Sequence, residues 1–186
     1  MLLGILLIPL LLLSSQQNAL SQAQQEQFQT YENPDYKIKI LYPDTWKKSE
    51  ENLNTQPPEI VEFSAPENVS SNILFSRPVA LIVLWTQFLP KGTTFEQYTS
   101  ENIKNVTDNI QGYKLLNSTP IVLSDNHQGQ KLVFYDYTGN AVIKKMRVFT
   151  MNNQTVYGIT YDADPGRYLR YLPLAQKMID SFQFIR

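Results

Sequence analysis

Hydrophobic and polar residues alternate in the first long segment that follows the N-terminal region. Tyr36, Ile38, Ile40 and Tyr42 fall on one face, whereas the lysines between them fall on the other. Because successive side chains of a strand point to opposite faces, this alternation predicts a half-buried β-strand. A second strand is predicted over residues 60–64.

An unbroken apolar run over residues 79–85 predicts a strand at the centre of a sheet. A strand that is apolar on both faces is typical of a sheet covered on both sides. We therefore expect helices on both faces of the sheet, with Trp85 in the core.

Four further strands are predicted in the C-terminal half, joined by turns of residues that tolerate positive φ. Links this short force neighbouring strands to pair antiparallel. The predicted strands are 113–123, 130–137, 142–151 and 156–162, and the turns are Asp125-Asn126, Gly139-Asn140 and Asn152-Asn153.

Two helices are predicted from capping residues and apolar stripes. A pair of threonines precedes Glu96 and Gln97, which is the pattern of a capping box, and Gly112 is a typical terminator of that helix. The second helix is predicted to begin at Pro173, because proline is favoured in the first helical turn. The fold class that follows is α+β: an antiparallel β-sheet sandwiched between helices, in α/β/α layers.

The N-terminal segment is a separate apolar block. Residues 2–13 are almost entirely aliphatic and are followed by a polar stretch. A membrane-spanning helix needs about 20 apolar residues, whereas the core of an export signal needs roughly 7 to 15. We predict a signal peptide over residues 1–23, with an uncleaved N-terminal anchor as the alternative. A flexible linker over 24–27 and a single domain over 28–186 complete the predicted organisation.

Composition narrows the function classes. The chain has no cysteine, so it has neither disulfides nor thiolate metal sites, and its stability must come from packing. Its 16 basic residues nearly balance 17 acidic residues, which argues against nucleic-acid binding. We expect a monomeric protein outside the cytoplasm, either secreted or peripheral on the outer face of the cytoplasmic membrane.

Four short motifs, in this order and spacing, resemble the PsbP-like family over residues 28–186. The resemblance implies an antiparallel sheet between helices and a non-enzymatic, extracytoplasmic accessory protein. The best-known members dock on photosystem II and help to retain its calcium and chloride, and PsbP-like chains also occur in organisms without photosynthesis. The family defines no catalytic residue that maps onto this chain. We expect no cofactor, with calcium as the alternative. The motifs are Tyr42-Pro43-Asp44-Thr45-Trp46, Thr94-Phe95-Glu96-Gln97-Tyr98, Val156-Tyr157-Gly158-Ile159-Thr160-Tyr161 and Ile179-Asp180-Ser181-Phe182.

Two acidic residues near the end of the last predicted strand are candidate metal ligands. Asp162 and Asp164 are two positions apart, so their carboxylates are expected on one side, where they would offer oxygen ligands to calcium. The alternative for Asp164 is a helix-capping role before Pro165.

Other polar residues have simpler interpretations. Lys144, Lys145 and Arg147 are interpreted as protection of an edge strand, with partner binding as the alternative. The single histidine, His127, is predicted to be an exposed loop residue, and no serine-nucleophile motif is present. We therefore expect no enzyme activity. Four sequons mark candidate N-glycosylation sites in polar or turn-like segments, at Asn68, Asn105, Asn117 and Asn153. The alternative is that a chain rich in Asn and Thr contains such short triplets by chance.

These observations favour an exported, non-enzymatic binding domain that docks on a membrane or envelope protein complex. The alternative is a secreted small-ligand binder or enzyme that uses a groove near Asp162 to Arg170.

Overall fold

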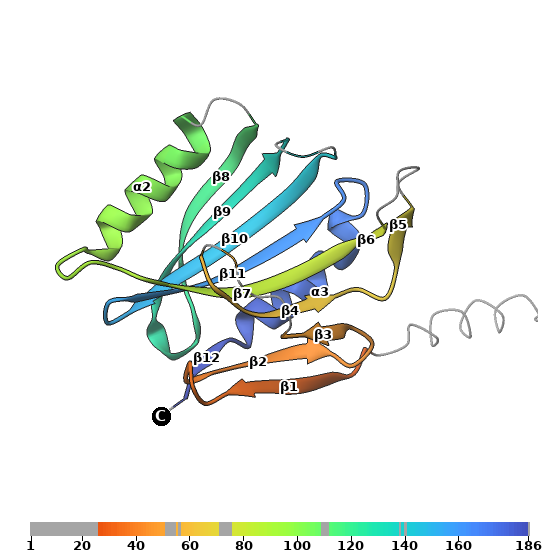
Figure 1. The fold of residues 1–186 in the computed structure, drawn as a ribbon, viewed down its shortest axis with the longest axis horizontal. Coiled ribbons are helices and arrows are strands. Elements are labelled where there is room, and N and C mark those ends of the chain that lie inside the picture. The colour runs from red at the N-terminus through yellow and green to blue at the C-terminus, as the bar shows by residue number, and fades with distance from the viewer. Residues whose placement is uncertain are drawn as a thin grey trace, which may run out of the picture.

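A seven-stranded antiparallel sheet forms the centre of the structure (Figure 1). The computed structural model describes residues 26–50, 55, 57–70, 76–108, 112–137, 139 and 141–185, so the predicted leader lies outside the described residues. In spatial order the sheet consists of β3 (Lys47–Ser49), β4 (Glu59–Ser64), β7 (Ala80–Phe88), β11 (Thr155–Ala163), β10 (Ile143–Asn152), β9 (Gln128–Asp136) and β8 (Tyr113–Val122).

Smaller elements surround this sheet. Among the described residues, two helices and two small antiparallel sheets accompany it, and a single turn of 3-10 helix precedes β9. They are helices α2 (Phe95–Asp108) and α3 (Tyr168–Asp180), the three-stranded sheet of β1 (Phe28–Asn33), β2 (Ile38–Pro43) and β12 (Gln183–Phe184), the two-stranded sheet of β5 (Asn68–Ser70) and β6 (Ser76–Pro78), and η1 (Ser124–Asn126).

The first face of the large sheet carries the main hydrophobic core. Helix α3 packs against β2, β7 and β11 on this face. Tyr161 is fully buried there, and its hydroxyl donates a hydrogen bond of 2.8 Å to the carbonyl oxygen of Tyr168 at the start of α3. Residues of β7 and β11 that point to this face pack with residues of α3 and of the three-stranded sheet, among them Ile82, Leu84, Ile159, Met178, Ile179 and Ile40.

The second face is covered by α2 at one end. Helix α2 packs against β8 and β9, and Tyr98 meets the ring of Phe149 edge-on with centroids 5.4 Å apart. This smaller core also contains Trp85, Val106 and Phe134. Over β7 and β11 the same face lines an open pocket.

The antiparallel α+β fold agrees with the prediction, but the predicted sandwich between helices is not confirmed. The three-stranded sheet shares the first face with α3, and α2 packs against the β8–β9 end of the second face. Strand β7 is an interior strand of the sheet, and Trp85 is buried as predicted. The apolar run of β7 is not covered by helices on both sides. On the second face, its residues Val83 and Trp85 line the pocket.

The predicted start of the last helix was wrong. Helix α3 begins at Tyr168, and Pro173 lies inside it. Tyr168 and Tyr171 are buried against the first face, so packing extends the helix five residues ahead of the proline. Pro173 cannot donate one backbone hydrogen bond of the helix, and the burial of Tyr168 and Tyr171 offsets this loss.

Candidate functional site

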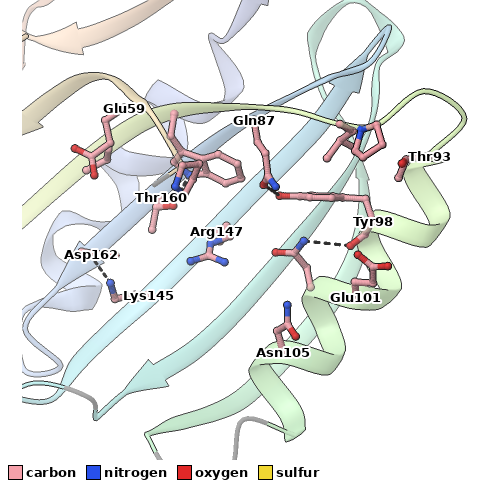
Figure 2. Close-up of a pocket in the computed structure, with 16 residues that line it drawn as sticks. Glu59, Gln87, Thr93, Tyr98, Glu101, Asn105, Lys145, Arg147, Thr160 and Asp162 are labelled. Carbon is pink, nitrogen blue, oxygen red and sulfur yellow. Dashed lines mark hydrogen bonds and ion pairs between the residues drawn. The ribbon is translucent and has the colours of Figure 1, made fainter. Parts of the chain in front are cut away.

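An open pocket of about 570 Å³ lies on the second face of the sheet (Figure 2). Its floor is formed by β7, β10 and β11, and α2 forms one wall. Glu59 of β4 lies at the rim away from α2. The pocket is therefore bounded by segments that are far apart in the sequence.

The strand period explains why polar groups meet on this floor. Lys145 and Arg147 are two positions apart on β10, as are Thr160 and Asp162 on β11, so all four point to the same face. The register pairs Lys145 with Asp162 and Arg147 with Thr160. Met146 and the other residues between them point into the main core.

Lys145 is held between two carboxylates. Its Nζ lies 2.9 Å from Asp162 Oδ2 and 3.3 Å from Asp136 Oδ2. Burial opposes the positive charge of Lys145, but Asp162 and Asp136 outweigh this effect and raise its pKa. Burial raises the pKa of Asp162 against the opposing attraction of Lys145. The second oxygen of Asp162, Oδ1, is buried without a hydrogen-bond partner.

Arg147 is the cation on the pocket floor that forms no hydrogen bond or ion pair with another described residue. Its guanidinium lies 5.5 Å from the ring centroid of Phe134 and 5.9 Å from that of Trp85. Its Nε is buried without a hydrogen bond, and no carboxylate of the described residues lies within ion-pair distance of it. The neighbouring hydroxyl of Thr160 already accepts a hydrogen bond of 2.9 Å from Trp85 Nε1. Arg147 thus presents unused donors to the pocket.

The α2 wall is fixed by polar contacts. The hydroxyl of Tyr98 donates to Gln87 Oε1 at 3.0 Å, and Asn102 Nδ2 donates to the carbonyl oxygen of Tyr98 at 3.1 Å (Figure 2). Burial raises the pKa of Tyr98, which keeps the hydroxyl a donor. Glu101 lies exposed on the same wall.

The start of this wall is fixed by the predicted capping box. Thr94 Oγ1 accepts a hydrogen bond from the backbone N–H of Gln97, and Gln97 Oε1 accepts one from the backbone N–H of Thr94. Two backbone amides at the beginning of α2 are thereby satisfied.

The two predicted calcium ligands occupy different places. Asp162 lies in the pocket and binds Lys145, whereas Asp164 lies beyond the end of β11 and accepts a hydrogen bond of 2.9 Å from the backbone N–H of Gly166. Asp164 does not cap α3, whose N-cap is Arg167. Within the described part of the chain, no group of three or more His, Asp or Glu side chains is placed to hold a metal ion. Calcium binding stays a prediction.

The predicted groove is only partly correct. Asp162 lies in the pocket, but Arg170 lies on α3, against the opposite face of the sheet. Arg170 is exposed and forms an ion pair with Glu67, with Nη2 and Oε1 2.7 Å apart.

The edge-strand interpretation of the basic cluster was wrong. Strand β10 lies between β9 and β11, so it is an interior strand of the sheet. Lys145 and Arg147 line the pocket, whereas Lys144 lies on the other face with its Nζ 4.3 Å from the ring centroid of Tyr168. The alternation of charged and apolar residues on β10, matched by Thr160 and Asp162, was the signal that could have revealed a polar pocket. His127 is half-buried, with its ring centroid 4.7 Å from that of Phe184, rather than exposed.

The four sequons lie in different settings. Asn68 lies in β5, Asn105 is exposed on α2 beside the pocket, and Asn117 is exposed in β8, where its Oδ1 accepts a hydrogen bond from Thr119. Asn153 alone occupies a tight turn, with φ of 55°. Glycosylation stays a prediction for all four.

Comparisons with known proteins show that this domain has a PsbP-like fold. No protein-family model matches the chain, and no curated protein matches it. Three solved structures match it over at least 93% of their own length. The PsbP protein of the cyanobacterium Synechocystis superimposes with a TM-score of 0.63 at 16% identity, covering 88% of this chain and 95% of that one. The predicted resemblance is confirmed at the level of the fold.

Two other solved structures share the fold. LpqN of Mycobacterium tuberculosis, described as involved in cell envelope biogenesis, has a TM-score of 0.61 at 12% identity, covering 88% of this chain and 93% of that one. The Ran-binding protein Mog1p of Saccharomyces cerevisiae has a TM-score of 0.57 at 7% identity, covering 86% of this chain and 96% of that one. These likenesses show a shared fold. No helix among the described residues is long and apolar enough to cross a membrane.

Proposed function

We propose that this chain is an exported, non-enzymatic PsbP-like accessory domain that binds a protein of a membrane or envelope complex through the pocket beside α2. The observation that carries the proposal is the asymmetry of the large sheet. Its first face is covered by α3 and the three-stranded sheet. Its second face has an open pocket, in which the guanidinium of Arg147 forms no hydrogen bond or ion pair with a described residue. A polar recess of this kind suits contact with another molecule.

The solved structures with the same fold support a binding role. Mog1p is a Ran-binding protein, and LpqN takes part in cell envelope biogenesis. The non-enzymatic part of the proposal is supported by the position of the single histidine, which packs against Phe184 on β12 rather than in the pocket. The pocket therefore has no imidazole to serve as a general base.

The export part of the proposal rests on the apolar N-terminal segment of the sequence. Cell fractionation of the host, with N-terminal sequencing of the recovered chain, tests it. We expect the protein outside the cytoplasm, either beginning after residue 23 or retained by the intact segment. Recovery of the full-length product in the cytosol would contradict this part of the proposal.

The docking part is tested by affinity purification of the tagged chain from detergent-solubilised membranes of its host. We expect one partner in a stoichiometric complex that survives gel filtration. A chain that elutes alone from every detergent extract would contradict docking.

A secreted small-ligand binder is the second candidate, favoured by the pocket volume. About 570 Å³ lies in the usual range for ligand sites, roughly 300–1,000 Å³. Most such sites are enclosed and largely apolar, whereas this one is open and charged, which favours a protein partner. Native mass spectrometry of the chain purified from its host separates the two candidates, because a retained small molecule supports the second.

A further inference from the structure

We propose that the pocket recognises an acidic side chain of the partner protein, whose carboxylate binds Arg147, and that basic side chains next to it in the partner pair with Glu59 and Glu101. This inference rests on the proposed docking function and specifies its chemistry.

Arg147 carries the recognition because its hydrogen-bonding capacity is unused. The guanidinium is positioned by the rings of Phe134 and Trp85, and its Nε is buried without a partner among the described residues. The terminal nitrogens of the guanidinium are the donors that an incoming acceptor can reach, because Nε has almost no accessible surface whereas Arg147 lines the pocket. A carboxylate satisfies a guanidinium with two parallel hydrogen bonds, so it is the group that this position fits best.

The other cation of the floor is already neutralised. Lys145 is bound by both Asp136 and Asp162, at 3.3 and 2.9 Å. An incoming carboxylate would gain little from a lysine that already has two carboxylate partners. The specific contact therefore falls to Arg147 rather than to the basic pair as a whole.

Two acidic residues at the rim of the pocket favour basic residues next to the acidic residue of the partner. Glu59 lies on the β4 side of the pocket and Glu101 on the α2 side, and neither forms an ion pair with another described residue (Figure 2). A purely acidic segment would be repelled by this rim, whereas a segment with basic residues on both sides of its acidic residue is complementary to it. A protein segment supplies this arrangement of alternating charges in one piece, so we assign the occupant to a partner protein.

Peptide binding to the full chain tests the proposal. The probe is a peptide with blocked ends, acetyl-Ala-Lys-Asp-Lys-Ala-amide, and its matched control has Asn in place of Asp. Binding is measured by fluorescence polarisation and by the NMR signals of Arg147 Nε–H and Trp85 Nε1–H. We expect the Asp peptide to shift both signals and to bind at least about tenfold more tightly than the Asn peptide, as for loss of a charge-assisted contact.

Variants localise the contact. Arg147→Gln should remove the preference for Asp over Asn. Arg170→Gln is the matched control, because it removes one positive charge from the opposite side of the sheet and should leave binding unchanged. Glu101→Lys tests the rim on an exposed helix position, and should weaken the Lys-Asp-Lys peptide several-fold even where Arg147→Gln fails to fold.

Several results would overturn the inference. Equal binding of the Asp and Asn peptides, or unchanged binding by Arg147→Gln and Glu101→Lys, would show that the pocket does not recognise a carboxylate in this way. Free aspartate that binds as tightly as the peptide would assign the pocket to a small molecule. A partner captured from membranes equally well by wild type and Arg147→Gln would overturn this inference but leave the proposed docking function intact. Peptide binding that depends on Arg147, found without any membrane partner, would instead contradict the docking function and leave the recognition of a carboxylate intact.

Discussion

Trp85 lies directly across Gly158 on the paired strands β7 and β11, and its ring occupies the space that a side chain at position 158 would need. A Cβ atom on residue 158 would lie 2.0 Å from atoms of the indole ring. This close approach places the ring on the pocket floor, where its Nε1–H bonds Thr160 and its face lies near Arg147.

We predict that Gly158→Ala destabilises the protein by roughly 2 kcal/mol, because the ring must move and strain the core around it. Urea denaturation followed by tryptophan fluorescence measures the change. Gly139→Ala is the matched control, since a Cβ there meets nothing within 4 Å, and it should change the free energy of unfolding by less than about 0.5 kcal/mol. Equal stability of Gly158→Ala and wild type would show that the indole ring is not held over Gly158.

Removal of the shared cation should also destabilise the fold. We expect Lys145→Met to lower the free energy of unfolding by roughly 2 kcal/mol at neutral pH, because it removes the cation that both Asp136 and Asp162 bind. Lys144→Met is the control on the opposite face, where the contacts of Lys144 Nζ with the rings of Tyr168 and Tyr135 are lost, and it should cost less than about 1 kcal/mol.

The deficit of Lys145→Met should depend on pH. Burial already raises the pKa of Asp162, and the loss of Lys145 raises it further. A raised pKa in the folded state contributes stability below the unfolded pKa, near 3.8 for Asp, and this contribution is lost as pH rises through the folded pKa. The variant should therefore approach wild type in acid and fall behind it towards pH 7, as urea titrations at several pH values would show. A deficit that is constant with pH would contradict the electrostatic explanation.

Alkaline pH should weaken the main core through its buried tyrosines. Burial raises the pKa of Tyr161 above its usual range, and raises the pKa of Tyr168 to about 12. Their contributions to stability are complete below the unfolded pKa of 10.0 and are lost as pH rises above it through the folded values.

We expect Tyr161→Phe to cost about 1 kcal/mol at neutral pH, because the hydrogen bond to the carbonyl oxygen of Tyr168 disappears. The same variant should lose stability less steeply than wild type above pH 10, because one buried phenol is gone. Circular dichroism with tyrosinate absorbance follows both changes. Tyr137→Phe, at a position 46% exposed, should match wild type throughout, and identical alkaline profiles for all three proteins would contradict the prediction.

The cap of α2 should contribute measurably to the wall of the pocket. We predict that Thr94→Ala lowers the free energy of unfolding by about 1 kcal/mol, because the backbone N–H of Gln97 loses its acceptor. Thr94→Ser retains the hydroxyl and should recover most of that loss. Urea denaturation compares the two variants, and equal stability of both would show that the capping hydrogen bond contributes nothing.

Local patterns predicted most of the elements. The strands around Ile38–Pro43 and in the C-terminal half, the capping box at Thr94 and the turn at Asn153 all depend on neighbours within a few residues. Strand β1 was missed because its residues are mostly exposed or half-exposed, so its pattern lacks a continuous apolar face. The start of α3 was placed too late because the burial of Tyr168 depends on Tyr161, which lies in another element.

The sequence by itself determined that this is a cysteine-free, antiparallel α+β chain, since composition and the two-residue period of strands are local properties. The tertiary structure alone decided that β10 is an interior strand, that Arg147 lies near the rings of Phe134 and Trp85, and that Lys145 binds both Asp136 and Asp162. Which strands become neighbours depends on contacts between residues far apart in the chain, and a charged side chain has the same local pattern whether it meets solvent or lines a pocket.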